Sequence, residues 1–146
     1  MAMDIDSKYR PLLEAELEPG EELDGLLVCS QQKGMFKGGA AVIGVTRRRL
    51  ILQETNRRGD LDGAPRSILP EDLADAEAGD AGGGWPTIAS EIMDREAAKL
   101  TLKLRDGDTV KLMMMRGSDS GFGRLGGGEV QRRGVESLAD WLRRLG

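Results

Sequence analysis

The chain has 146 residues and a formal net charge of −4, with 25 acidic and 21 basic side chains. It has no histidine and one cysteine, Cys29. These counts exclude imidazole catalysis, an intrachain disulfide and a zinc site built from cysteine and histidine. Because 39% of the residues are apolar and only 3% are aromatic, we expect a single domain over residues 1–146 with an aliphatic core.

The distribution of charge is uneven. Residues 25–58 carry seven bases and one acid, whereas residues 1–24 and 59–80 are each strongly acidic. A nucleic-acid-binding domain is usually basic as a whole, so no nucleic-acid partner is expected. The N-terminus lacks the order of a signal peptide, and no apolar run approaches the roughly 20 residues of a spanning helix. We therefore expect a cytoplasmic protein that is not transmembrane.

The first half of the chain predicts one short helix followed by strands. Residues 10–17, RPLLEAEL, have the leucine spacing of an amphipathic helix inside an N-terminal helical extension, 1–19, and Pro19-Gly20 ends it. Apolar and β-branched runs predict strands at residues 23–30, 40–46, 50–55 and 66–69. Three arginines, 47–49, occupy the connection between the second and third of these strands.

The next segments are less regular. Residues 71–78, EDLADAEA, favour a helix by propensity, although a further strand is also compatible with them. Glycine-rich sequence predicts long loops at residues 79–94 and 117–130.

The clearest pattern is the alternation of residues 99–115, KLTLKLRDGDTVKLMMM, which predicts a β-hairpin with one buried face. Only an odd loop length keeps the leucines and Val110 on the same face. We therefore predict a three-residue loop, 106–108, that pairs Leu104 with Val110. Apolar residues spaced by three and four then predict a C-terminal amphipathic helix with the stripe Val135, Leu138, Trp141, Leu142 and Leu145.

Several of these segments resemble the bacterial pleckstrin-homology-like (PH-like) domain family over roughly residues 15–145. LEPGEEL at 17–23 resembles the opening of such domains, and VTRRRLIL at 45–52 is similar to their second strand pair, at Val45, Thr46, Arg49 and Leu50. RSILPEDLADAEAG at 66–79 resembles a later segment, with its apolar positions shifted. The hairpin and the C-terminal helix complete the pattern.

This resemblance implies a mostly β fold with flanking helices: a bent antiparallel sandwich or barrel of about seven strands, capped by the C-terminal α-helix. It also implies that residues 71–78 form a strand or an irregular edge. Eukaryotic relatives often bind phosphoinositides, and some bacterial members assemble into rings. The resemblance therefore specifies architecture better than function.

The preferred functional hypothesis is a non-catalytic interaction or scaffolding domain that self-associates or binds a protein partner. Alternation places Met113 and Met115 on the non-core face, and with Ile51 they would form an adaptable apolar patch. In the alternative arrangement, the 79–94 loop folds over these methionines. The expected state is a homo-oligomer.

The alternative hypothesis is binding of anionic phosphate groups or membrane-surface lipids through basic loops. The candidate residues are Lys33, Lys37, Arg47, Arg48, Arg57 and Arg58. Met35 and Phe36 would form a membrane or partner loop between the two lysines. Against this hypothesis, strand 40–46 carries no base.

Catalytic and metal-binding chemistry have little support. Cys29 lies in apolar sequence, which predicts a buried, inert thiol. The sequence D-x-D-G at 60–63 is only a fragment of a calcium loop. No pattern places a nucleophile beside a base, so we expect neither an enzyme nor a cofactor.

Arg47 and Arg48 are predicted to occupy a tight turn, and Arg49 to belong to the strand pair. Replacing both Arg47 and Arg48 with glutamate is therefore expected to leave the fold intact, because turn side chains at these positions lie in solvent. Circular dichroism and thermal unfolding of the double variant measure this, and a loss of the folded signal contradicts the turn assignment.

Overall fold

The computed structural model describes residues 5–32, 38–56, 58–79, 84–94, 97–115 and 128–145. The helices are α1 (Ile5–Glu14), α2 (Trp85–Asp94) and α4 (Gly128–Arg143), with a short 3₁₀ turn, η1, at Pro70–Asp72. The strands are β1 (Gly25–Gln32), β2 (Gly38–Val45), β3 (Leu50–Thr55), β4 (Arg66–Ile68), β5 (Leu73–Ala78), β6 (Ala97–Leu104) and β7 (Thr109–Met115). This order confirms the mostly β fold with flanking helices.

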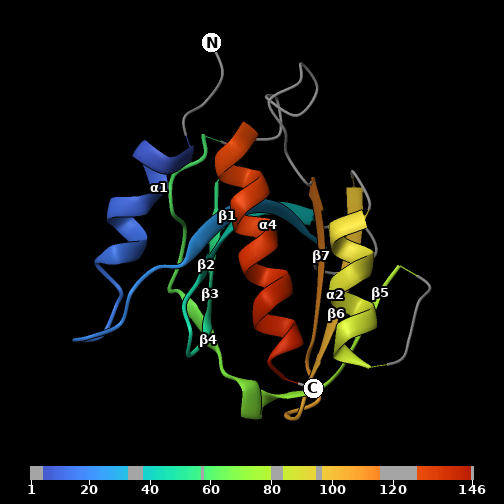
Figure 1. The fold of residues 1–146 in the computed structure, drawn as a ribbon. Helices are drawn as coiled ribbons and strands as arrows, with labels where there is room; N and C mark the ends of the chain where they lie inside the picture. The colour runs from blue at the N-terminus through green and yellow to red at the C-terminus, as the bar shows by residue number, and fades with distance from the viewer. Residues whose placement is uncertain are drawn as a thin grey trace.

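The described strands form one seven-stranded antiparallel sheet in the order β4-β3-β2-β1-β7-β6-β5. The sheet curls into a half-barrel, and α4 crosses its inner side with α2 alongside (Figure 1). β1 is the strand that turns the corner. It pairs with β2 along its whole length but with β7 only over residues 30–32.

Inward-facing side chains from the strands meet α2 and α4 in one large core. Trp141, Leu138 and Val135 of α4 lie in this core, which confirms the predicted helical stripe. A second, smaller core lies on the outer side of the sheet, where α1 covers β1, β2 and β3. Its buried residues are Ile5, Tyr9, Leu13, Leu26, Val42 and Ile51.

Gln131 of α4 fills the gap that opens where β1 separates from β7. Its buried side-chain amide accepts a hydrogen bond from the Val28 N–H (2.8 Å) and donates to the carbonyls of Val28 (2.9 Å) and Met115 (2.7 Å). The side chain therefore takes the place of a strand partner for backbone groups that would otherwise remain unpaired. The sequence pattern gave no sign of this role.

Several predicted elements differ from the structure. Residues 85–94 form helix α2 within the stretch predicted as a loop, because Ile88, Ala89 and Ile92 lie on one helical face and become buried. The N-terminal helix begins at Ile5, so Pro11 lies inside it and not in its first turn.

Residues 71–78 have the structure that the family resemblance implies, and not the helix that their intrinsic propensity favours. Residues 73–78 form strand β5, in which Leu73, Ala76 and Ala78 are buried. Packing against β6 therefore outweighs the intrinsic preference of alanine and glutamate for helix.

The β6–β7 hairpin keeps the predicted faces but differs in register by two residues. Leu102 pairs with Val110, and the Leu104 N–H donates to the Asp108 carbonyl (2.9 Å), so the three-residue loop is 105–107 and not 106–108. Gly107 has φ +94°, a conformation that favours glycine and that places the turn one residue earlier. The faces are unchanged because both loops have an odd number of residues.

A close contact between α4 and β1 determines how deeply the helix is seated. A Cβ added at Gly134 would lie 1.9 Å from the Leu26 carbonyl oxygen and 2.9 Å from the Leu27 Cβ. Only a glycine can occupy this position without pushing the helix away from the strand, because the nearest atom belongs to backbone.

Gly134→Ala is therefore expected to lower the free energy of unfolding by more than about 2 kcal/mol. Urea unfolding measures this change, which appears as a lower midpoint concentration of urea. Helix propensity alone would predict a stabilisation of about 1 kcal/mol, so the sign of the change separates packing from propensity. Gly39→Ala is the matched control, since a Cβ there has no atom within 4 Å. Equal midpoints for Gly134→Ala and the wild type would contradict the close contact.

Candidate functional site

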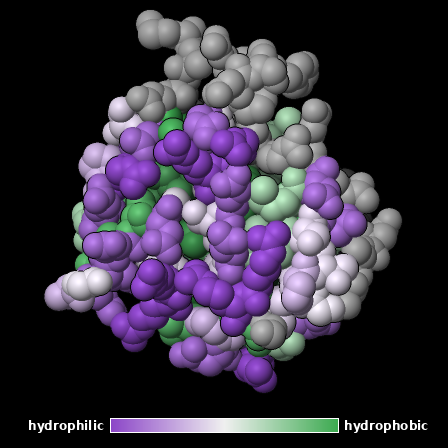
Figure 2. Space-filling model, viewed as in Figure 1, coloured by the Kyte–Doolittle hydropathy of each residue, from purple (hydrophilic) through white to green (hydrophobic). Residues whose placement is uncertain are grey.

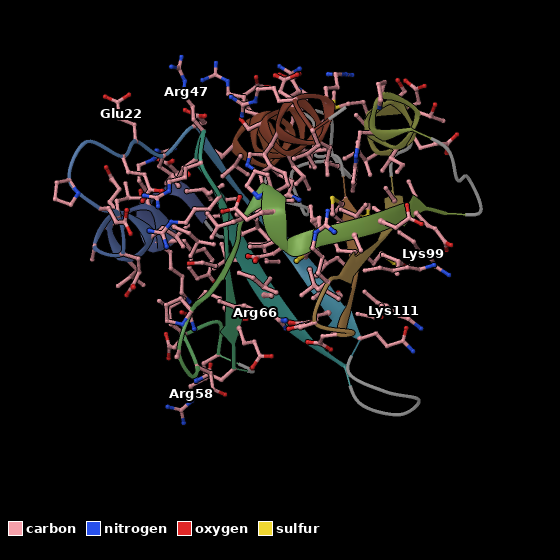
Figure 3. The ribbon with its side chains drawn as sticks, turned by 90° about the horizontal axis from the view of Figure 1, so that it is seen from below. Glu22, Arg47, Arg58, Arg66, Lys99 and Lys111 are labelled. Carbon is pink, nitrogen blue, oxygen red and sulfur yellow. The ribbon has the colours of Figure 1, made fainter. Side chains whose placement is uncertain are left out.

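The described basic residues of segment 33–58 do not form one surface. Val45 pairs with Leu50, so the 46–49 turn lies at one end of the β2–β3 hairpin, and Arg58 follows the opposite end. Arg47 and Arg58 accordingly point to opposite sides of the molecule (Figure 3). The remaining candidates, Lys33, Lys37, Arg57, Met35 and Phe36, lie outside the described residues.

Arg47 and Arg48 lie among acidic side chains. Arg48 forms an exposed ion pair with Glu18 (2.6 Å). A hollow of about 360 Å³ beside the two arginines is lined by residues of which four are acidic: Glu18, Pro19, Gly20, Glu21, Glu22, Asp24, Arg47 and Arg48. A phosphate would meet these carboxylates as well as the arginines, so this end of the molecule is poorly suited to anions. Thr46 and Arg49 close the turn through a backbone hydrogen bond (3.0 Å), as the turn prediction requires.

Arg49 is a structural residue. Its guanidinium binds both carboxylate oxygens of Glu21 (2.8 and 2.9 Å) and also donates to the Ser67 hydroxyl (2.6 Å) and the Glu16 carbonyl (2.9 Å). The two charged side chains are only 13% and 8% exposed. The pair therefore joins the segment before β1 to the β2–β3 turn and to β4, and four of the five guanidinium N–H groups are used within the protein.

Thr46 completes this network. Its buried hydroxyl donates to the Glu21 carboxylate (3.0 Å) and accepts hydrogen bonds from the backbone N–H groups of Arg48 (3.2 Å) and Arg49 (3.0 Å). Hydrogen bonds from Arg49, with smaller contributions from Thr46, lower the pKa of Glu21 from its ordinary 4.5 to about 2, against an opposing effect of burial.

Of the predicted apolar patch, the structure brings together two residues and removes the third. Met113 and Met115 are 43% and 37% exposed on the outer side of β7, while Met114 points into the core. Ile51 is 1% exposed and lies under α1 in the smaller core, so it is not part of a patch. Helix α2 packs with α4 on the inner side of the sheet, so residues 85–94 do not cover the methionines as the alternative arrangement predicts.

The methionines belong to a row of outward-facing residues that crosses the sheet. Lys99 pairs with Met113, Met113 with Ser30, Ser30 with Ala40 and Ala40 with Thr55. The first four of these residues are exposed. Ser30 and Ala40 have small side chains, so the surface is low in the middle of the row, between the methionines and α1.

Two hollows meet on this surface and share Ser30 and Met113. The first, of about 520 Å³, is lined by Ser30, Gln31, Gln32, Gly39, Lys99, Thr101, Lys111, Leu112 and Met113. The second, of about 420 Å³, extends past Met115 and Ala40 to Tyr9 and Arg58. We call these two hollows together the outer groove, and use Lys99, Lys111, Met113, Met115 and Ser30 as its defining residues.

The lysines of the outer groove were not singled out from the sequence. Lys99 and Lys111 project from β6 and β7 away from α2 and α4 (Figure 3). The alternation of the hairpin placed both lysines on the non-core face, and this pattern could have identified them as exposed. The pairing of β1 with β7, which completes the groove beside them, is a tertiary contact that the alternation does not predict. By contrast, the face that carries α4 shows mostly hydrophilic residues and no broad apolar area (Figure 2).

The remaining chemical candidates show no assembled site. Cys29 is 7% exposed, and burial raises the pKa of its thiol to about 12, so the reactive thiolate is suppressed. Among the described residues, no group of three or more acidic or cysteine side chains is placed to hold a metal ion. Within the same part of the chain, no helix is long and apolar enough to cross a membrane.

No family model and no curated protein matches this chain. Solved structures do resemble it. The C-terminal domain of an unknown protein from Leishmania infantum matches with a TM-score of 0.50 and 18% identity, over 76% of this chain and 84% of that chain. The hSac2 domain from the human phosphoinositide phosphatase Sac2 matches with a TM-score of 0.53 and 9% identity, over 97% of this chain and 79% of that chain.

The hSac2 domain has a PH-like fold. The curled antiparallel sheet and C-terminal helix of this chain fit that fold. At 9% and 18% identity, these similarities concern the fold alone. They name no partner for this chain.

Glu21→Gln is expected to reduce the free energy of unfolding near neutral pH by about 1–2 kcal/mol, because it leaves the largely buried guanidinium of Arg49 without a counter-charge. The folded pKa of Glu21 is depressed, so its contribution is complete above pH 4.5 and is lost as the pH falls towards about 2. The difference in the free energy of unfolding between the wild type and the variant, measured in urea, should therefore become smaller as the pH falls from 4.5 towards about 2. Glu22→Gln, at an exposed neighbour, is the control, and a difference independent of pH would contradict the assigned pair.

Proposed function

We propose that this chain is a non-catalytic interaction domain that binds protein through the outer groove. The observation that carries the proposal is the exposure of Met113 and Met115 beside two connected hollows, on the part of the outer sheet face that α1 leaves uncovered. The only other large apolar side chain exposed among the described residues is Leu12, at 43%, on α1. Two exposed methionines on one strand thus mark this face among the described surfaces.

The chemistry of methionine suits such a role. Its unbranched, polarisable side chain adapts to partners of different shape. Covering a half-exposed methionine contributes about 1 kcal/mol from the remaining apolar area, so two of them supply a useful part of a micromolar affinity. Ser30 and Thr101 add hydroxyl groups at the edges of the same hollow.

The non-catalytic part of the proposal rests on the chemistry of the side chains. The chain has no histidine, and the thiol of Cys29 is held in its protonated form by burial. The strongest pKa perturbation of a carboxylate, at Glu21, is explained by its ion pair with Arg49. A perturbed group with a structural partner is weak support for catalysis.

The alternative function, binding of anionic phosphate or lipid through the 33–58 basic loops, has weaker support. Arg47 and Arg48 lie beside acidic residues, and Arg58 lies at the other end of the hairpin. The described residues of that segment thus offer no shared pocket for one phosphate group.

Replacing both methionines, Met113→Ser with Met115→Ser, is expected to weaken protein binding at least about tenfold, because it removes the apolar contact while the inward face is untouched. Sedimentation velocity over a concentration series measures self-association, and titration calorimetry measures binding of a purified partner identified by cross-linking. Leu12→Ser is the matched control, because Leu12 is as exposed as Met113 but lies on α1.

Loss of binding in the methionine variant, with binding retained in Leu12→Ser, supports the outer groove as the contact surface. If the methionine variant self-associates and binds the partner as the wild type does, the groove is not that surface. A wild type that is monomeric at every concentration excludes self-association and leaves a second protein as the partner.

A further inference from the structure

We propose that the outer groove accepts an acidic polypeptide segment that also carries apolar side chains. Its carboxylates would lie against Lys99 and Lys111, and its apolar groups against Met113 and Met115. This inference rests on the proposed function and narrows it, since it states which kind of protein the groove binds.

The first support is the unmatched positive charge of the groove. Lys99 and Lys111 are exposed, and neither forms an ion pair with any residue in the described ranges. The neighbouring Lys103 differs, because it pairs with Glu77 at 3.1 Å. Glu77 of the edge strand β5 therefore neutralises only Lys103. Lys99 and Lys111 remain available to a partner.

The second support is the placement of these cations relative to the methionines. Lys99 is paired with Met113 across β6 and β7, and Lys111 is paired with Thr101 in the same hairpin. The two lysines therefore occupy one face, on neighbouring strands, and both project into solvent from it (Figure 3). A segment that carries carboxylates and apolar groups in alternation can meet a lysine and a methionine within the same short stretch.

The third support is at the far side of the groove. The second hollow continues past Ser30 and Ala40 to Arg58, whose side chain is exposed. Cations therefore border the groove at both ends, with small and apolar residues between them. The surrounding chain has a net charge of −4, so this cationic face is a local feature that selects where an acidic partner binds.

These observations favour an acidic protein segment over other occupants. A second copy docked by a two-fold axis would place the lysines of one groove near those of the other, which is repulsive. Binding of single-stranded nucleic acid typically uses exposed aromatic rings on which the bases stack. Among the described residues, the aromatic side chain that lines the groove is that of Tyr9, which is buried and whose hydroxyl donates to the Gly59 carbonyl (2.7 Å).

The test is selection of a random-peptide display library on the wild-type protein, with counter-selection on the Met113→Ser, Met115→Ser variant. We expect enriched peptides to combine aspartate or glutamate with leucine, isoleucine or phenylalanine. A synthetic copy of the most enriched peptide, measured by fluorescence anisotropy, should bind the Lys99→Glu, Lys111→Glu variant at least about tenfold more weakly. The affinity should also fall as salt is raised.

A charge swap separates recognition from damage to the fold. The same peptide with its acidic residues replaced by lysine should bind the Lys99→Glu, Lys111→Glu variant more tightly than it binds the wild type, which an unfolded variant cannot do. Arg47→Glu with Arg144→Glu changes two exposed cations outside the groove, and this control should retain wild-type affinity.

Several results would overturn the inference. These are enrichment of peptides without an excess of acidic residues, equal binding of the acidic and lysine peptides by the wild type, or no enrichment above counter-selection. Phosphatidylserine vesicles that bind through Lys99 and Lys111 and displace the peptide would assign the groove to lipid. If a purified partner depends on Met113 and Met115 but not on the lysines, the proposed function stands and only this inference fails.

Discussion

The largely buried ion pair between Arg49 and Glu21 is the interaction on which the arrangement of the outer face depends. From the turn between β2 and β3, this guanidinium binds the segment that precedes β1 and also Ser67 of β4. Such a pair is costly to desolvate, so its net contribution to stability is small. The two parallel hydrogen bonds of the planar guanidinium instead fix the position of the Glu21 segment relative to the β2–β3 turn. By holding residues 16–21 against the turn, it places α1 over the outer side of β1, β2 and β3.

The position of α1 explains why the groove lies where it does. Ile51 and Met113 are both outward-facing residues of the same sheet, yet Ile51 is covered by α1 and Met113 is not. The helix covers one half of the outer face and leaves the β6–β7 half uncovered. On the inner side, Gly134 and Gln131 seat α4 at the corner where β1 leaves β7, and this corner creates the curl that separates the two halves.

The spacing of apolar residues predicted those elements whose buried face in the structure is the face that this spacing specifies. The alternating residues of β6 and β7 and the apolar stripe of α4 each specify one buried face, so both were predicted correctly. Segment 73–78 is different, because its alanines favour helix and only pairing with β6 makes it a strand. Helix α2 was predicted as a loop because its short apolar period comes directly after glycine-rich sequence. The hairpin loop lies one residue earlier than predicted because Gly107 adopts a positive φ.

The sequence by itself determined the faces of the strands, because these follow from side-chain periodicity within short segments. Its resemblance to a known family implied the class of fold and the place of Arg49 in a strand pair. Only the tertiary structure decided which outward-facing residues stay uncovered. Arg47 and Arg58 are eleven positions apart in a basic segment, yet the antiparallel hairpin carries them to opposite ends. Lys99, Met113 and Ser30 come from distant segments, and strand pairing sets them side by side, since register joins residues that sequence distance separates.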